Sequence, residues 1–293
     1  MPIPSKFPQE RPSTYAIQDR SKEELTRLRV QDEAAAMTLG LVPEQPDPAR
    51  FQRVLDVACG TGGWLIRMAK TYPAIPLLIG ADISQRTLDY ARAQAREHRV
   101  SDRVEFHQMD AQHRLEFPAE FFDLINQRFA MSYLRTWDWP KLLQEFYRVA
   151  KPGGVIRLTE GDFPADSSSP ALVHLSRLMA QAAYQAGHIF APNQNGISGE
   201  LGRLLQQYGE LEDVQIYVHA VEHRAGTVDG QLFIEDEKHI FRTGLPFLQK
   251  WTRLPDNYEE LYQQMICELE RPNFVTATHV VTAWGTRSLS QVS

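Results

Sequence analysis

An acid and a cluster of glycines stand close together early in the chain. In the segment VLDVACGTGG, Asp56 lies inside an apolar run, and Gly60, Gly62 and Gly63 follow it. A glycine-rich turn costs conformational entropy but lets the backbone come close to a ligand. A helix that starts directly after such a turn favours negative charge at its first residues. The segment therefore predicts a ligand site at the end of a buried strand.

Two more acids follow the next two strand-like segments. Asp82 ends LLIGAD and lies about 20 residues after Gly60, which is the spacing at which an acid can bond a ribose diol. Asp110 stands at the end of the third segment, in FHQMDAQ, where an acid can accept the exocyclic amine of an adenine. Ligands of open parallel sheets bind outside the carboxyl ends of the strands. The acids therefore predict a nucleoside site at that edge.

Two kinds of nucleotide cofactor remain open from these residues: a nicotinamide or flavin dinucleotide, and S-adenosylmethionine (SAM). The dinucleotide pattern needs glycine at its first, third and sixth positions, and the sixth position counted from Gly60 is Leu65. Asp56 would repel the phosphates of a dinucleotide and attract the ammonium and sulfonium groups of SAM. The residues favour SAM, while a nicotinamide-dependent oxidoreductase and a non-catalytic SAM-binding protein stay open as alternatives.

These side chains need a scaffold that brings strand ends together, and the sequence around them alternates strand-like and helical segments. Five segments are strand-like: FQRVLDVAC, IPLLIGADIS, RVEFHQMDA, FFDLINQRF and VIRLTEGDF. Runs such as VLDVA and PLLIG are apolar without strict alternation, which is typical of strands covered on both faces. The alternation predicts an α/β fold, with a doubly wound, Rossmann-like, mostly parallel sheet, helices on both faces and right-handed crossovers.

The second half of the chain has a different pattern and is expected to contain a helical insertion. Residues 168–187, 196–210 and 229–270 are expected to be mainly helical. Two more segments, VQIYVHAVEHRAGT and FVTATHVVTAWGTR, are strand-like and bring the expected sheet to seven strands. The KPGG sequence at 151–154 is expected to form a turn, with Gly153 at positive φ.

We expect one domain overall, in three parts. Residues 1–50 would form an N-terminal helical lid, whose helix is predicted to begin at a capping box of Ser21 and Glu24. Residues 51–162 would form the SAM-binding core. Residues 163–293 would supply substrate-enclosing helices together with the final strands of the same sheet.

Composition limits the function classes. The 293 residues carry a formal net charge of -6 and no polybasic arm, so nucleic acid is not expected as a partner. No apolar run approaches the ~20 residues of a membrane span, and the N-terminus lacks the apolar core of a secretory signal. The two cysteines, Cys59 and Cys267, suggest no disulfide framework. We expect a reduced, cytoplasmic protein of open oligomeric state.

Five features together resemble the class I SAM-dependent methyltransferases: VLDVACGTGG, GADIS, QMDAQ, FFDLINQRF and EFYRVAKPGGVIRLTE. The resemblance covers roughly residues 52–162 and is similar to the group that contains quinone-biosynthesis and small-molecule natural-product enzymes. It implies a SAM-dependent methyltransferase that transfers a methyl group to a small organic acceptor by in-line displacement.

The resemblance also implies a role for each matched residue at the methionine end of SAM. Asp56 and the backbone of Ala58 and Gly60 would hold the methionine part. Gln127, just past the fourth strand, would lie beside it. The family often has glycine where this chain has Ala58, so the backbone approach there is expected to be slightly longer.

At the nucleoside end, the resemblance implies contacts to the ribose and the adenine. Asp82 would bond the ribose hydroxyls, and Ile83 would pack on the adenine ring. Asp110 and Ala111 would read the edge of the adenine. Tyr15, just ahead of the first helix, resembles an aromatic residue that related enzymes lay over the cofactor as part of a lid.

A base is needed only if the acceptor must lose a proton. Asp162 and His188 are the candidates for this catalytic role, because Asp162 follows the fifth strand at the binding edge and His188 lies in the part expected to enclose the acceptor. No metal site is expected. One histidine pair, His219 and His223, has helical ligand spacing, but on the predicted strand its members would lie roughly 13 Å apart.

Motifs of other methyltransferase classes are missing. The fourth strand ends in INQRF, which differs from the Asn/Asp-Pro-Pro-aromatic motif of enzymes that methylate adenine or glutamine amides. Neither cysteine follows a proline, as the nucleophile of cytosine-carbon methylation would. With the acidic balance, these features favour a small, mainly apolar organic acceptor.

Overall fold

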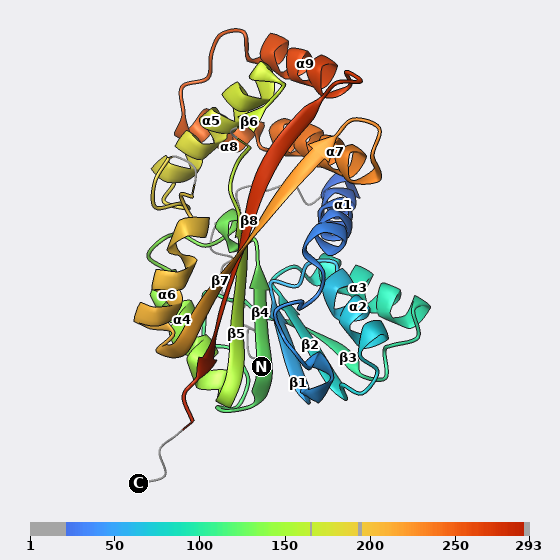
Figure 1. The fold of residues 1–293 in the computed structure, drawn as a ribbon, viewed down its shortest axis with the longest axis vertical. Coiled ribbons are helices and arrows are strands. Elements are labelled where there is room, and N and C mark those ends of the chain that lie inside the picture. The colour runs from blue at the N-terminus through green and yellow to red at the C-terminus, as the bar shows by residue number, and fades with distance from the viewer. Residues whose placement is uncertain (1–21, 165, 193–194, 290–293) are drawn as a thin grey trace, which may run out of the picture.

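The computed structural model describes residues 22–164, 166–192 and 195–289 (Figure 1). Tyr15 and Ser21 lie outside the described residues. Within the described residues, eight strands form one sheet: β1 Arg53–Val57, β2 Leu77–Asp82, β3 Val104–Gln108, β4 Phe122–Arg128, β5 Ala150–Gly161, β6 Asp166–Ser167, β7 Leu211–Arg224 and β8 Val275–Arg287. Their order is β3-β2-β1-β4-β5-β8-β6, and β7 also pairs with β8.

The first five strands are parallel, as the alternation of strands and helices predicts. The last three pairings, which all involve β8, are antiparallel. The predicted seven strands are present, and the two-residue β6 is an additional one. It has no hydrophobic pattern of its own and exists because Asp166 and Ser167 pair with Ala277 and Thr276 of β8.

Nine α-helices occur in the part of the chain that the structure describes: α1 Lys22–Leu39, α2 Gly63–Thr71, α3 Gln85–Glu97, α4 Trp139–Val149, α5 Pro170–Gln185, α6 Leu201–Tyr208, α7 Val228–Thr243, α8 Leu245–Trp251 and α9 Tyr258–Leu269. Three short 3-10 helices accompany them: η1 Pro48–Arg50, η2 Ala130–Ser132 and η3 Ser198–Glu200. None of these helices has the length and apolarity that crossing a membrane would require.

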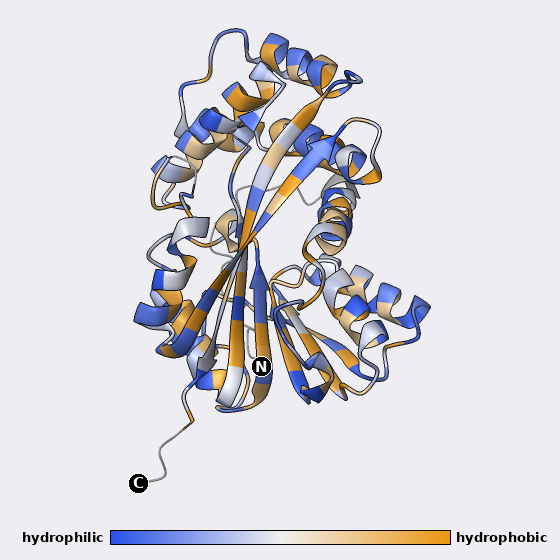
Figure 2. Ribbon diagram, in the orientation of Figure 1, coloured by the Kyte–Doolittle hydropathy of each residue, from blue (hydrophilic) through white to orange (hydrophobic). Residues whose placement is uncertain are grey.

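Helices cover both faces of the parallel strands. Successive strand residues point to opposite faces, so Val54 packs with α2 and α3 whereas Leu55 packs with α4 and α6. Figure 2 shows apolar residues along the central strands, while the helices carry both apolar and hydrophilic residues. Burial on both faces explains why these strands lack strict alternation.

The C-terminal half adds a helical region beyond the carboxyl end of the parallel strands. β8 pairs with β5 only from Val280 to Thr286, and its first part continues past the sheet alongside β7 (Figure 1). The helices α5, α7, α8 and α9 form a separate apolar cluster around this ribbon. The helical insertion predicted for this half is therefore present.

One local prediction was wrong. The KPGG sequence at 151–154 belongs to β5 and does not form a separate turn. Phe122 pairs with Ala150 but Leu124 with Val155, so the extra residues form an irregularity inside the strand pair. Gly153 does have the predicted positive φ, at 76°.

Candidate cofactor site

The three acids of the sequence pattern meet at one edge of the sheet. Asp56 is next to last in β1, Asp82 ends β2, and Asp110 follows β3 by two residues. These strands are parallel neighbours, so their carboxyl ends lie side by side. Tyr133 lies among the acids: burial raises the pKa of its hydroxyl, and the charges of Glu160, Asp82, Asp56 and Asp110 raise it further. The three acids therefore lie together at this edge of the sheet.

The three glycines of the turn are needed for different reasons. Gly62, with φ 74°, caps α2, and a side-chain carbon there would lie 2.7 Å from the ring of Phe106. A side chain at Gly63 would overlap the carboxylate of Asp32 from α1. Gly60, with φ 54°, would place a side-chain carbon in open space, with no atom of the described residues within 4 Å. Gly60 is thus the position of the turn that faces a space where a ligand can approach the backbone.

Asp82 ties the glycine turn to the end of β2. Its Oδ2 accepts a hydrogen bond of 2.9 Å from the backbone N–H of Gly60, and its Oδ1 accepts one of 2.9 Å from the backbone N–H of Ser84. Burial raises the pKa of Asp82, and these bonds lower it. Each carboxylate oxygen has a second lone pair, so Asp82 can also accept from a hydroxyl group. Next to it, the Ile83 side chain is 59% exposed and offers an apolar surface.

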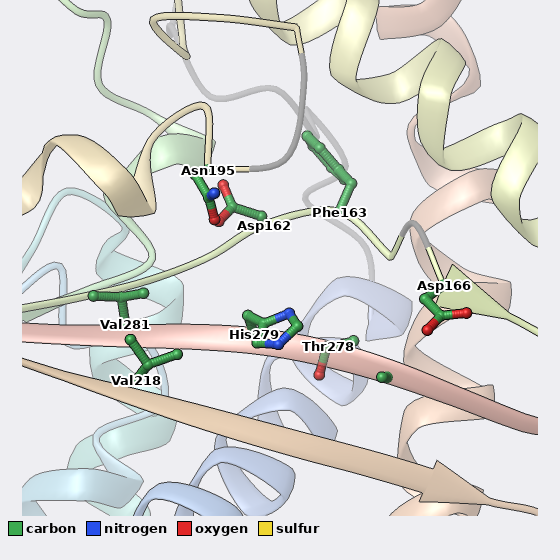
Figure 3. Close-up of a pocket in the computed structure, with 9 residues that line it drawn as sticks. Asp162, Phe163, Asp166, Asn195, Val218, Thr278, His279 and Val281 are labelled. Atoms are coloured by element: carbon green, nitrogen blue, oxygen red, sulfur yellow. The ribbon is translucent and has the colours of Figure 1, made fainter.

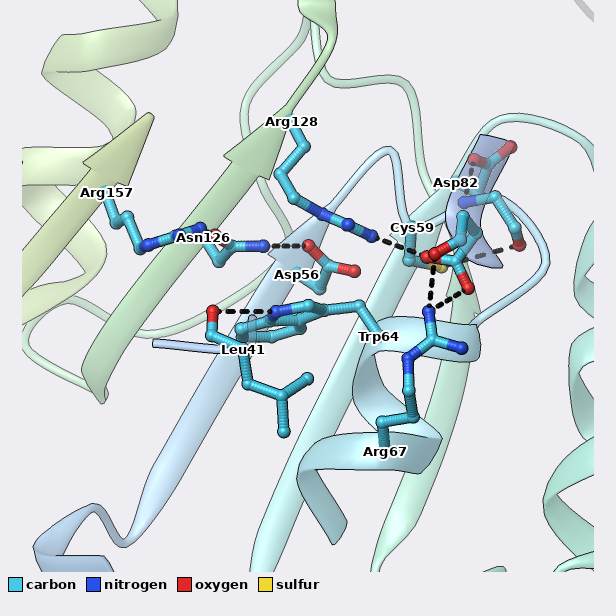
Figure 4. Close-up of polar contacts among 11 residues, drawn as sticks. Leu41, Asp56, Cys59, Trp64, Arg67, Asp82, Asn126, Arg128 and Arg157 are labelled. Atoms are coloured by element: carbon cyan, nitrogen blue, oxygen red, sulfur yellow. Dashed lines mark hydrogen bonds and ion pairs between the residues drawn. The ribbon is translucent and has the colours of Figure 1, made fainter. Parts of the chain in front are cut away.

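Asp56 is buried and keeps one oxygen without a partner. Its Oδ1 accepts a hydrogen bond of 2.7 Å from the side-chain amide of Asn126 (Figure 4). Among the described residues, no group donates to Oδ2. Burial raises the pKa of Asp56 to about 6, against the opposing effects of Arg128 and Asn126. A buried, unpartnered carboxylate oxygen is costly and therefore suits a cationic donor such as an ammonium group.

Asp110 is held by its own turn. Its Oδ1 accepts from the backbone N–H of Gln112 at 2.9 Å, and its Oδ2 lies 2.9 Å from His113 Nδ1. Ala111 is half-buried beside it. The turn leaves the Asp110 side chain 36% exposed at the sheet edge, where it can accept further bonds.

Residues 54–154 match the family model described as a methyltransferase domain. Residues 54–154 therefore form a class I methyltransferase domain. This family is SAM-dependent, so the resemblance seen in the sequence is confirmed.

The methyltransferase domain has relatives of similar sequence over part of their length. The chain is 38% identical to a demethylmenaquinone methyltransferase of Lactiplantibacillus plantarum over 111 residues, which are 38% of this chain and 46% of that protein. It is 31% identical to methyltransferase pytC of Aspergillus terreus, over 46% of this chain and 40% of that one. The chain thus spans less than half the length of these curated relatives.

A similar fold occurs in solved structures. A phosphoethanolamine N-methyltransferase 2 of Haemonchus contortus, in complex with S-adenosyl-L-methionine, matches with a TM-score of 0.57 and 17% identity. The match covers 96% of this chain and 61% of that one. The similarity supports the predicted fold class over the whole chain, including the part outside residues 54–154.

Two polar residues at the end of β4 face opposite sides of the methyltransferase sheet. Asn126 contacts Asp56, whereas Gln127 points to the other face and donates to Glu160 Oε1 at 3.4 Å. The resemblance drew attention to Gln127, and sequence reasoning missed Asn126 and Glu160. A signal was available: each is a polar residue near the carboxyl end of a predicted strand.

Glu160 is a fully buried acid near the end of β5. It accepts hydrogen bonds from the backbone N–H groups of Ala130 at 2.6 Å and Met131 at 3.3 Å. Burial raises its pKa to about 8, although these bonds oppose the shift. Glu160 therefore holds η2 against the sheet and positions the segment that leads to Tyr133.

The helix α1 is fixed to the methyltransferase core by an ion-pair cluster. Asp32 Oδ1 lies 2.9 Å from Arg128 Nη2, and Oδ2 pairs with Arg67 of α2 (Figure 4). The guanidinium of Arg128 also lies over the ring of Trp64, 5.9 Å from its centroid. α1 is therefore held against α2 and the end of β4, next to the glycine turn.

The two predicted bases are in different surroundings. Asp162 accepts from the backbone N–H of Ile197 at 3.5 Å and from the Ser198 hydroxyl. It also lines a cavity of about 240 Å³, and Figure 3 shows it beside Asn195 and across from His279 of β8. Asp162 therefore stands at a cavity wall while it fixes the start of η3.

His188 is buried behind η2 and is not one of the residues that line this cavity. Its Nδ1 is 2.8 Å from the carbonyl oxygen of Leu134, so this nitrogen carries the proton. Its ring contacts Phe247 edge-on, with 5.8 Å between centroids. Burial lowers its pKa and so favours the neutral ring. These contacts give His188 a structural role, and the structure does not bring it together with Asp162.

Proposed function

We propose that this chain binds SAM at the carboxyl edge of β1 to β4 and transfers its methyl group to a small organic acceptor. The observation that carries the proposal is the pairing of Gly60, which faces open space, with the partnerless Oδ2 of Asp56. An open backbone approach beside a buried anionic oxygen suits a ligand that is cationic and close to the main chain.

Asp56 would accept the ammonium group of the methionine part through its Oδ2. The backbone of Ala58 and Gly60 would run alongside, and both residues have a φ of 54°. For Ala58 this left-handed conformation is strained, which supports a functional reason for the turn. Gln127 stays a prediction here, because its described contact is with Glu160 on the other face.

Asp82 and Asp110 would hold the nucleoside. Asp82 has lone pairs left for the ribose hydroxyls after its two backbone bonds. The exposed Ile83 side chain would pack on the adenine, and the turn of Asp110 and Ala111 would meet its edge. Tyr15 remains a prediction as a lid residue.

When bound, SAM would supply an electrophilic methyl group for an in-line displacement by the acceptor. The chain's own contribution would be positioning: it fixes the two partners in line and excludes water. The cavity of about 240 Å³ next to Asp162 supports a small acceptor, since its walls combine Phe163, Val218 and Val281 with a few polar groups. Asp162, at this wall, is the better-placed of the two candidate bases.

The three-part division of the chain also belongs to this proposal. The contact of α1 with the glycine turn and α2 supports the proposal that residues 1–50 form a lid. The cavity beside β8 supports the proposal that residues 163–293 enclose the acceptor. A cytoplasmic location is supported by the free thiols of Cys59 and Cys267.

Calorimetric titration with SAM and with S-adenosylhomocysteine tests the binding half of the proposal. We expect saturable binding of both at one site per chain. Absence of binding to either compound at millimolar concentration would overturn the proposal. Incubation with SAM and a panel of small phenols, quinols and amines tests the transfer half. Release of S-adenosylhomocysteine with any acceptor supports catalysis, whereas binding without release across the panel favours a non-catalytic SAM-binding protein.

A further inference from the structure

A row of polar side chains crosses three neighbouring strands below the cofactor site. Asp56 of β1 pairs in register with Asn126 of β4, and Asn126 pairs in register with Arg157 of β5. All three side chains are buried, with exposures of 2%, 0% and 1%. Figure 4 shows Arg157, Asn126 and Asp56 following one another toward the glycine turn. Arg157, at the far end of this row, has no role in the site as described so far.

Hydrogen bonds connect the row from one end to the other. Glu44, from the segment after α1, lies 2.7 Å from Arg157 Nε. Arg157 Nη1 donates to Asn126 Oδ1 at 2.8 Å, and Asn126 Nδ2 donates to Asp56 Oδ1 at 2.7 Å. The last atom of the row is Asp56 Oδ2, which receives no bond from the described residues.

The chemistry of the partners fixes the direction of the amide. A guanidinium is only a donor and an ionised carboxylate is only an acceptor. Asn126 must therefore turn its oxygen to Arg157 and its NH₂ group to Asp56. Without Arg157, Asn126 Oδ1 would lose its donor, and the amide would be held in place by its bond to Asp56 alone.

The charges of the row are balanced without Asp56. A buried arginine without a partner would be strongly destabilising, and Glu44 compensates it with a side chain that is 6% exposed. Arg157 therefore does not need Asp56 as an ion-pair partner, and the carboxylate remains available for a ligand.

We propose that Arg157 is a positioning residue for cofactor binding: it fixes the Asn126 amide so that Asp56 Oδ2 is the open acceptor for the ammonium group of the ligand. The inference rests on the proposed function, because it assumes that SAM and its product bind at this edge. It assigns to Arg157 recognition of one group of the ligand, the α-amine, while the nucleoside end is held independently.

Two ligands separate this role from a general effect on folding. One is S-adenosylhomocysteine, and the other is its deaminated analogue, in which hydrogen replaces the α-amino group. The ratio of their dissociation constants reports recognition of the amine alone. Arg157→Met is expected to weaken binding of S-adenosylhomocysteine by about tenfold to a hundredfold and to leave the analogue within about twofold.

Three further variants sharpen the test. Arg157→Lys is expected to keep most of the amine preference, because an ammonium is also only a donor. Glu44→Gln is expected to lower the melting temperature but to keep the preference, because Arg157 still orients the amide. The double variant Glu44→Gln/Arg157→Met removes the ion pair without leaving a buried charge, so it measures the preference even if Arg157→Met alone does not fold.

Arg287→Met is the matched control. Arg287 also pairs with an acid, Glu120, at 2.8 Å, but at the end of β8 remote from the cofactor edge. The Arg287→Met variant is expected to lose stability without any change in the ratio of the two dissociation constants. If the wild-type protein binds neither ligand, the proposed function itself fails. If the wild type prefers S-adenosylhomocysteine and the double variant keeps the same ratio, or loses both ligands equally, the role of Arg157 is overturned while the proposed function stands.

Discussion

The backbone N–H of Gly60 donates a hydrogen bond of 2.9 Å to Asp82, 22 residues further along the chain. The bond joins the glycine turn after β1 to the end of β2. Since the second oxygen of Asp82 accepts from Ser84, one carboxylate fixes the two loops that would surround a nucleoside. Loop geometry and ligand binding therefore depend on the same side chain.

Asp82→Asn should weaken binding of every adenosine-containing ligand by about tenfold or more. An amide accepts through one oxygen only, so either Gly60 or Ser84 would lose its partner and meet an NH₂ group instead. Calorimetry with S-adenosylhomocysteine and with its deaminated analogue measures the effect, and both ligands should lose affinity together.

Asp123→Asn is the control for Asp82→Asn. Asp123 also accepts from two backbone N–H groups, those of Gln52 at 3.1 Å and Arg53 at 2.7 Å, but at the opposite end of the sheet. The Asp123→Asn substitution should lower the free energy of unfolding and leave ligand affinity unchanged. Equal ligand affinities of Asp82→Asn and the wild type would contradict the ribose role of Asp82.

Gly62→Ala should mainly lose stability, whereas Gly60→Ala should mainly lose ligand affinity. Both positions have positive φ, which costs a residue with a side chain about 1 to 2 kcal/mol. At Gly62 the added carbon also meets Phe106, so unfolding in urea should show the larger loss of stability there. At Gly60 the carbon enters open space, so the folded variant should bind S-adenosylhomocysteine at least about tenfold more weakly. A Gly60→Ala variant with wild-type affinity would show that the open space is not a ligand site.

Asp162→Asn should lower turnover with little effect on SAM binding, provided that the acceptor must lose a proton. The carboxylate also bonds to Ser198, so a structural effect has to be separated from a basic one. Ser198→Ala removes this bond and keeps the acid. If Asp162 is the base, only Asp162→Asn lowers turnover in a steady-state assay. Equal losses of turnover in the two variants would mean that Asp162 only positions η3. Unchanged turnover in Asp162→Asn would show that Asp162 takes no part in the reaction.

Glu160 should make the ligand-free protein less stable as the pH rises. Its pKa is raised to about 8 in the folded protein, whereas an unfolded chain has the ordinary value near 4.5. Between these values the folded state keeps a proton that the unfolded state has lost. Stability is therefore highest near or below pH 4.5 for this group and falls toward pH 8, by at most about 1.4 kcal/mol per pH unit.

Melting temperatures of the wild type and Glu160→Gln from pH 5 to 9 measure this contribution. The variant should show a flatter decline, since glutamine does not ionise. Glu237, whose pKa burial also raises to about 8, adds a decline of the same sign, and Glu237→Gln provides the comparison at a site away from the sheet edge. Parallel curves for Glu160→Gln and the wild type would mean that the three donors around Glu160 keep it ionised.

The sequence by itself was sufficient to predict the parallel strands of the sheet and the position of three acids at its edge. Asp56, Asp82 and Asp110 each stand at the end of a strand-like run, and parallel neighbours place such ends side by side. Apolar runs without alternation predicted burial on both faces, which Val54 and Leu55 show directly. These features are local, because each depends on a few consecutive residues and on general rules for connecting strands.

Only the tertiary structure decided which polar residues contact one another. The sequence contains Asn126 and Gln127 side by side, but the strand register turns Asn126 toward Asp56 and Gln127 toward Glu160. The partners Glu44 and Arg157 are more than a hundred positions apart, as are Thr159 and Thr282. Periodicity in a sequence reports which face of an element is apolar, whereas a buried charge is tolerated only where the folded chain supplies its partner. Such partners come from remote segments, and only the folded chain brings them within hydrogen-bond distance.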